Sequence, residues 1–223
     1  MTVPRTPGRR LGILGGTLDP IHYGHLDAAH AARAALALDE VRFMPAHDPP
    51  HRPIDPRTSA FHRFALVALA IEGHQGFRAS DLELQREGPS YTIDTLRALH
   101  TEGWTASQIF FIIGADAFAE IATWYRYPAF LDAANFAVIA RPGTTIAAAL
   151  ARTPALGSRV RTTPNDSAGT GVFLVEAVTR DVSSTAIRER LAAGRSIDDL
   201  VPSAVARHIL ANDLYKAVDT LHG

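Results

Sequence analysis

The 223-residue chain is expected to form an α/β fold, with helices on both faces of a doubly wound, mainly parallel sheet. Three observations predict this class. Short apolar runs of strand length alternate along the chain with segments of helical pattern. The run at residues 108–113 is apolar at nearly every position, which is typical of a central strand covered on both faces. The length also suffices for one sizeable domain with a full core.

The expected strands are short apolar or alternating runs, at residues 11–14, 40–45, 77–84, 108–113, 135–140 and 172–178. The first expected helix is rich in alanine, starts near His22 or Gly24 and runs to residue 36. The second covers residues 58–73, with an apolar side formed by Phe61, Phe64, Ala65, Ala68 and Leu69. Further helices are expected at residues 93–101, 117–123, 147–151, 183–193, 197–202 and 205–215.

We expect one domain over residues 1–223, because no linker or internal repeat interrupts the pattern. Residues 1–10, with two prolines and no apolar core, are expected to be flexible, and residues 183–223 to form small C-terminal helices. The turn-rich residues 162–171 are expected to form a loop.

The composition excludes several classes of protein. A net charge of −1 gives no electrostatic field that would favour nucleic acid or a membrane surface, and no 18-residue apolar run could span a bilayer. The absence of cysteine excludes disulfides and thiolate metal sites and, with no signal peptide, predicts a cytoplasmic protein. The sequence leaves the oligomeric state open, with a homodimer among the options.

Residues 15–25, GGTLDPIHYGH, join the first expected strand to the first expected helix. Gly15 and Gly16 let the backbone approach a ligand, because no Cβ is in the way. The following helix directs unpaired N–H groups and a partial positive charge at this turn, which therefore suits an anion. His22 and His25 are three residues apart, so both imidazoles can reach an anion held there.

Two other functions for this turn are less well supported. A metal site on His22 and His25 would gain support from a cysteine or from the Glu of an H-E-x-x-H pattern, and neither is present. The glycine spacing also differs from the G-x-G-x-x-G of dinucleotide-binding proteins.

Other helix starts and strand ends carry polar residues that suit the same ligand. They are residues 90–92 (SYT), residues 114–116 (GAD) and residues 183–188 (SSTAIR). Their hydroxyls and carboxylate can instead cap their own helices, and the two roles are compatible because a capped turn still presents free N–H groups. Thr185 and Arg188 are three residues apart, so a hydroxyl and a guanidinium can converge on a polyphosphate.

Three further features have both a structural and a ligand-binding interpretation. Trp124 and Tyr125 could stack on a flat base or pyridine ring, although packing is the commoner role of such pairs. Arg141 follows a buried strand and could direct its guanidinium at a phosphate or pair with a surface acid. The proline-rich residues 46–53 form an ordered surface loop, for which a rigid connector is the simpler role.

Two of these motifs resemble signatures of the nucleotidyltransferase superfamily. Residues 15–25 resemble its GGTFDPIHxGH signature, with Leu18 in place of Phe and the (H/T)xGH core at residues 22–25. Residues 182–188 are similar to its ISSTxIR signature, with Val182 for Ile. Between and after them come PPH at 49–51, SYT at 90–92, GAD at 114–116, Trp124 and NDLY at 212–215, in the order typical of bacterial nicotinate-nucleotide adenylyltransferases.

This resemblance covers residues 11–215 and implies a Rossmann-like fold that makes nicotinate adenine dinucleotide and pyrophosphate from ATP and nicotinate mononucleotide. The residues that would bind the ATP phosphates are Gly15, Gly16, Thr17, His22, His25, Ser183, Ser184, Thr185 and Arg188. Among them His22, His25 and Arg188 would carry catalysis, and Gly114 and Asp116 would border the adenosine. Nicotinate mononucleotide would meet Thr92, Trp124, Tyr125 and Arg141, with His51 and Arg52 as further candidates. In that loop Asp48 and Arg52 stand where the family often has Asn and Lys.

The reaction implied by the resemblance needs no general base, because its nucleophile is already a phosphate anion. Mg²⁺ would be held mainly by the ATP phosphates and water, since few carboxylates flank the motifs, and no metal site formed by protein side chains alone is expected. The alternatives are a related adenylyl- or cytidylyltransferase acting on nicotinamide mononucleotide, phosphopantetheine or glycerol phosphate, and a non-catalytic nucleotide-binding module.

Overall fold

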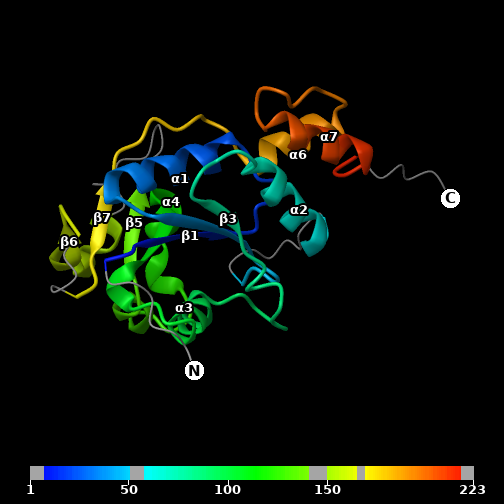
Figure 1. The fold of residues 1–223 in the computed structure, drawn as a ribbon. Coiled ribbons are helices and arrows are strands. Elements are labelled where there is room, and N and C mark those ends of the chain that lie inside the picture. The colour runs from blue at the N-terminus through cyan, green and yellow to red at the C-terminus, as the bar shows by residue number, and fades with distance from the viewer. Residues whose placement is uncertain (1–7, 51–57, 141–149, 165–168, 217–223) are drawn as a thin grey trace.

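The computed structural model describes residues 8–50, 58–140, 150–164 and 169–216 (Figure 1). Its strands are β1 (Leu11–Gly16), β2 (Glu40–Pro45), β3 (Phe77–Ala79), β4 (Ile109–Gly114), β5 (Asn135–Ile139), β6 (Val160–Arg161) and β7 (Val172–Val175). Its α-helices are α1 (Tyr23–Leu36), α2 (Ala60–Ala70), α3 (Thr92–Thr101), α4 (Ala115–Phe118), α6 (Ser184–Ala192) and α7 (Ser203–Ala211). Short 3₁₀ helices occupy Ala106–Gln108, Ile121–Thr123, Ala129–Asp132 and Pro154–Arg159.

The seven strands form one sheet in the order β3-β2-β1-β4-β5-β7-β6, and every pairing is parallel. From β1 the chain builds outward first through β2 and β3 and then, on the other side, through β4 and β5. This doubly wound order places the switch point between β1 and β4, outside whose carboxyl ends such sheets bind ligands. The predicted fold class is confirmed.

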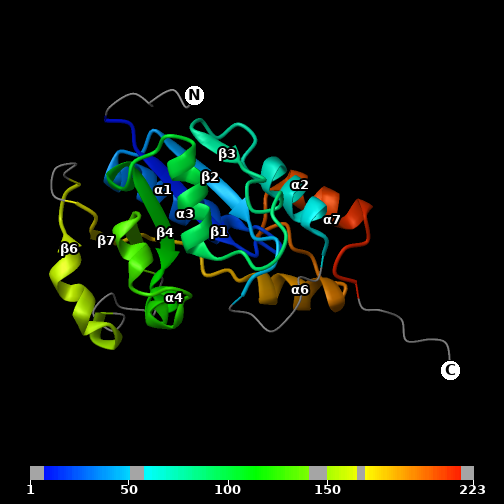
Figure 2. The ribbon, with the colours of Figure 1, turned by 90° about the horizontal axis from the view of Figure 1, so that it is seen from below.

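Both faces of the sheet are covered, because successive side chains of a strand point to opposite sides. Phe110 and Ile112 of β4 join a core with α1, α2, α6 and α7. Phe111 and Ile113 join a second core with α3 and α4. Figure 1 shows α1 and α3 on opposite sides of the sheet, and Figure 2 looks onto the side of α3 and α4. The predicted central, doubly covered strand is confirmed.

The face that α2 buries differs from the prediction. Phe61, which was expected on the apolar side, is 87% exposed, whereas the buried residues of the helix are Arg63, Leu66, Val67 and Ala70. The pattern of apolar side chains was misleading because a charged residue, Arg63, is part of the buried face. The reason lies in the acceptors that surround Arg63, described below.

Several predicted elements have other bounds in the structure. The strand expected at residues 77–84 ends at Ala79, because the chain then turns to bury Glu83, whose Oε1 accepts a 2.6 Å hydrogen bond from Thr95 Oγ1. The helix expected at 117–123 is instead α4 followed by the 3₁₀ turn Ile121–Thr123. The strand expected at residues 172–178 ends at Val175.

The C-terminal part also departs from expectation. Residues 197–202 form turns rather than a helix, and α7 begins directly after Pro202. Proline has no backbone N–H, so Pro202 cannot donate the hydrogen bond that a helix over residues 197–202 would need at its end. The expected helix at 147–151 and the expected loop at 162–171 lie partly outside the described residues. Most of residues 1–10, which were expected to be flexible, also lie outside them. In the part of the chain that the structure describes, no helix has the length and apolar character needed to cross a bilayer.

Candidate active site

The two signature turns lie side by side at the carboxyl ends of the central strands. Ser184 Oγ, at the start of α6, donates a 2.9 Å hydrogen bond to the carbonyl of Pro20. The Nη1 atom of Arg188 donates at 2.6 Å to the carbonyl of Asp19. Two segments separated by more than 160 residues therefore open onto one place, as a shared polyphosphate site requires.

The first turn needs glycine at one position. Gly16 has φ +150°, a conformation that side chains strongly disfavour, and nothing lies within 4 Å of where its Cβ would be. Leu18 has φ +50°, which is uncommon for a residue other than glycine and persists only when the surroundings hold it. The backbone at Gly16 is thus open to a ligand, and that at Leu18 is held in place.

His22 and His25 form a stacked pair at the start of α1. Their ring centroids are 3.7 Å apart, and the backbone N–H of His22 donates to Nδ1 of His25 at 3.3 Å. A ring nitrogen that accepts a hydrogen bond leaves the proton of neutral imidazole on the other nitrogen, so Nε2 of His25 is a donor. His22 is buried, with 2% of its surface exposed. The helix begins at Tyr23, between the two predicted starts, His22 and Gly24.

The start of α6 has the two features expected of it. Ser183 Oγ accepts from the N–H of Ala186 at 3.1 Å, so the predicted N-cap is confirmed. An Nη2–H of Arg188 donates to Thr185 Oγ1 at 3.2 Å, which confirms that hydroxyl and guanidinium converge. The side chains of Ser184, Thr185 and Arg188 thus gather beside residues 19–20.

The end of β4 lies next to the first turn. Leu14 of β1 is paired with Ile112 of β4, so Gly16 and Gly114 stand at the same level two residues further along. Asp116 is exposed in the first turn of α4. Its predicted alternative role as a helix N-cap is wrong, because α4 begins at Ala115 and Gly114 is its N-cap.

The residues expected to meet the second substrate lie around the start of α3. Tyr125 packs against Tyr91 with the two rings tilted and their centroids 4.3 Å apart, and it is 46% exposed, whereas Trp124 packs against Phe111 and Phe130. Thr92 is the first residue of α3. Tyr91 was not predicted, although it lies inside the quoted SYT motif.

The expected capping of α3 by Ser90 or Thr92 is wrong. Tyr91 is the N-cap and makes no side-chain capping bond. The hydroxyl of Ser90 accepts from the backbone N–H of His47 at 2.9 Å, and the N–H of Ser90 donates to the carbonyl of Asp48 at 2.7 Å. The SYT segment therefore anchors the loop after β2. His51, Arg52 and Arg141 lie outside the described residues, and their roles stay predictions.

Sequence reasoning missed the roles of three residues beneath the first turn, the buried Asp19 and Arg63 and the partly buried Tyr215. The carboxylate of Asp19, 3% exposed, accepts a 2.6 Å hydrogen bond from the hydroxyl of Tyr215. Burial, with the charge of Asp19 beside it, raises the pKa of Tyr215 well above its ordinary value, so the hydroxyl remains a donor. Arg63 donates to the carbonyl of Thr17 at 3.0 Å. The available signals were the acid in the DP pair of the first motif and the tyrosine that ends the NDLY segment.

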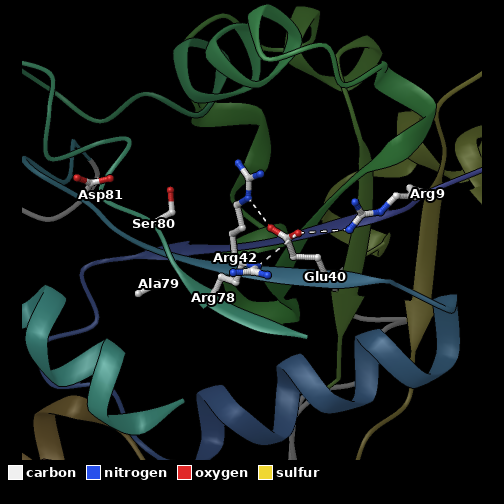
Figure 3. A pocket seen from close by; sticks show the side chains of 7 residues that line it. All are labelled: Arg9, Glu40, Arg42, Arg78, Ala79, Ser80 and Asp81. Carbon is white, nitrogen blue, oxygen red and sulfur yellow. Dashed lines mark hydrogen bonds and ion pairs between the residues drawn. The ribbon is translucent and has the colours of Figure 1, made fainter. Parts of the chain in front are cut away.

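A hollow of about 460 Å³ lies elsewhere, near the amino end of β2 (Figure 3). There Arg42, Arg9 and Arg78 approach the carboxylate of Glu40 at 2.8, 3.5 and 3.8 Å. None of the predicted site residues lines it. This ion-paired hollow is separate from the signature turns.

No group of three or more His, Asp or Glu side chains within the described ranges is arranged to hold a metal ion. The described turns instead offer backbone N–H groups, imidazoles and a guanidinium. These groups bind anions, so a metal would reach this site most readily together with a phosphate ligand.

The fold and the adjoining turns define a nucleotidyltransferase type of α/β protein, and a family model described as cytidylyltransferase-like matches residues 13–190. A curated relative from Trichlorobacter lovleyi, named probable nicotinate-nucleotide adenylyltransferase, is 41% identical and covers 93% of this chain and 99% of its own length. A protein of the same name from Pseudomonas aeruginosa is 40% identical over 94% of this chain and 99% of its own. The chain therefore belongs to the cytidylyltransferase-like family and, within it, to the nicotinate-nucleotide adenylyltransferases.

A solved structure agrees at the level of the fold. Plasmodium falciparum nicotinic acid mononucleotide adenylyltransferase, complexed with APC, aligns with a TM-score of 0.68 over 93% of this chain and 97% of its own, at 19% identity.

Proposed function

We propose that this protein transfers AMP from ATP to nicotinate mononucleotide, forming nicotinate adenine dinucleotide and releasing pyrophosphate. The observation that carries the proposal is the contact between the two signature turns, through Ser184 with Pro20 and Arg188 with Asp19. The names of the relatives supply the acceptor.

The proposed step is a displacement at the α-phosphorus of ATP. A phosphate oxygen of the acceptor forms the new bond, and the bond from the α-phosphorus to the pyrophosphate oxygen breaks. Since the nucleophile is already anionic, catalysis consists of bringing two anions together and stabilising the charge that develops on pyrophosphate.

The described residues suit that task. Gly15, Gly16 and the start of α1 would bind the triphosphate through backbone N–H groups, and the Nε2–H of His25 would donate to it. Arg188 would hold the same triphosphate from α6, where Thr185 already orients its guanidinium. Thr17, His22, Ser183 and Ser184 would complete this set of phosphate contacts.

The two organic parts of the substrates would occupy opposite sides of this centre. Gly114 and Asp116, beside the end of β1, would border the adenosine. Thr92 and Tyr125, brought together by the contact between the rings of Tyr91 and Tyr125, would meet the nicotinate mononucleotide together with Trp124. Backbone N–H groups near Thr92 and Tyr125 would then favour a carboxylate over an amide.

Mg²⁺ would enter with ATP and be held mainly by phosphate oxygens and water. When bound, it would offset charge on the triphosphate, which complements the guanidinium of Arg188. We expect the protein to act in the cytoplasm.

The test is pyrophosphate release from ATP and Mg²⁺ with nicotinate mononucleotide, compared with its amide, phosphopantetheine and glycerol phosphate, the last also with CTP. We expect turnover with nicotinate mononucleotide and a higher kcat/KM for it than for the amide. Equal values for acid and amide would overturn the substrate preference. Nucleotide binding without turnover on any acceptor would instead indicate a non-catalytic module.

A further inference from the structure

Arg63 is a charged residue on the buried face of α2, near the start of the helix. Its exposed fraction is 1%, and it forms no ion pair with any carboxylate among the described residues. Burial lowers its pKa, an effect only partly opposed by the charge of Asp19. Burying an ion without an ion-pair partner is unfavourable, and an apolar residue there would often give an equally stable protein.

The partners of Arg63 are three backbone carbonyls. Nη1 donates to Thr17 at 3.0 Å and to Ala46 at 2.5 Å, and Nη2 donates to His47 at 3.3 Å. Thr17 is the first residue after β1, and Ala46 is the first after β2. These two strands are neighbours, and the N–H of Ala46 also donates to the carbonyl of Gly16 at 2.8 Å. Arg63 therefore joins the two strand ends from which the ligand-binding turns leave.

The position of Thr17 gives this contact a consequence for the ligand. In the trans peptide between Thr17 and Leu18, the carbonyl and the N–H point in opposite directions. A carbonyl held toward Arg63 therefore turns the N–H of Leu18 away from the guanidinium. Leu18 has φ +50°, a conformation that its surroundings must maintain.

We propose that Arg63 is a positioning residue of the phosphate-binding turn. By holding the carbonyls of Thr17 and Ala46, it keeps residues 16–19 in the conformation that receives the triphosphate and keeps two carbonyl dipoles directed away from that anion. The proposal rests on the proposed function, because it concerns the ATP site assigned there. The residue itself makes no contact with the substrate.

Arg42 provides a matched control. It is also a largely buried arginine, with a side chain 12% exposed, and it lies on β2, next to β1. Its partners are Glu40 and Glu102, each at 2.8 Å, away from the signature turns.

The test compares Arg63→Lys, Arg63→Met and Arg42→Met with the unaltered protein, measuring the KM for ATP, the KM for the acceptor, kcat and thermal unfolding. For Arg63→Met we expect kcat/KM for ATP to fall by about 10- to 100-fold, the scale of removing a partner that orients the groups in direct contact with a ligand. Arg63→Lys keeps the charge but not the fork of donors, so its loss should be intermediate. Arg42→Met should lower the unfolding temperature without altering the KM for ATP.

Hydrogen exchange gives a readout that does not depend on turnover. In Arg63→Lys, the amides of residues 16–19 should exchange faster while those of β4 keep their protection. If Arg63→Met does not fold, Arg63→Lys decides the question.

A kcat/KM for ATP within about twofold of the unaltered protein in the folded Arg63 variants would overturn the proposal. So would a loss in kcat/KM that Arg42→Met reproduces. Failure of the proposed function would look different, because the unaltered protein itself would then show no turnover.

Discussion

Tyr215 joins the C-terminal segment to the first signature turn by one hydrogen bond. Its hydroxyl donates at 2.6 Å to the carboxylate of Asp19, which is 3% exposed. The change Tyr215→Phe removes this donor and keeps the ring. We expect it to destabilise the protein, because a buried carboxylate that loses a donor is not resolvated by bulk water.

The magnitude follows from the kind of bond. A hydrogen bond to a charged group contributes about 1.5–3 kcal/mol to stability. Taking about 2 kcal/mol, and about 2–4 °C per kcal/mol for a chain of this size, Tyr215→Phe should lower the unfolding temperature by about 4–8 °C.

Differential scanning calorimetry measures this loss, with Tyr127→Phe as the control. Tyr127 is also a partly buried tyrosine, it packs on Phe130, and its hydroxyl has no hydrogen-bond partner among the residues described. The control should therefore change the unfolding temperature by less than about 2 °C, the scale of a neutral substitution.

The pH dependence follows from the raised pKa of Tyr215. Because the folded pKa lies above the ordinary value of 10.0, the contribution is fully present below pH 10 and is lost only above it. The difference between Tyr215→Phe and the unaltered protein should thus stay constant from about pH 6 to about pH 9. Equal unfolding temperatures for Tyr215→Phe and Tyr127→Phe would refute the reasoning.

Three other predictions concern the site and its surroundings. His22→Ala or His25→Ala should lower kcat by roughly 10²-fold or more, the scale of removing one preorganised donor, and near-normal steady-state turnover in both would contradict their role. Arg188→Ala should lose its bond to the Asp19 carbonyl and raise the KM for ATP, so an unchanged rate at limiting ATP would count against it. Partial desolvation, with His74 and Arg33 nearby, lowers the pKa of the exposed His30 below its ordinary value of 6.5. The folded state then binds fewer protons than the unfolded one, so stability should fall as pH drops below about 6.5, and His30→Gln should reduce that fall in thermal unfolding scans.

Local sequence patterns predicted the elements nearest the site well. The bounds of β2 and the apolar character of β4 follow from short-range patterns of apolar residues. Such patterns predict buried strands directly, because successive side chains of a strand point to opposite faces of the sheet. The prediction for Ser183 was equally local, since a capping hydroxyl reaches an N–H three residues along. The capping roles expected of Ser90 and Asp116 were wrong, because tertiary contacts or a shifted helix start took those residues elsewhere.

The sequence alone determined the alternation of strands and helices and the residues of both signature turns, because these depend on neighbours a few positions apart. Only the tertiary structure decided that Arg63 faces inward and that Tyr215 reaches Asp19. Each of these contacts satisfies a buried polar group with a partner distant in the chain. The pattern of apolar residues does not reveal such partners. The acceptors of Arg63 are backbone carbonyls, which every residue type has.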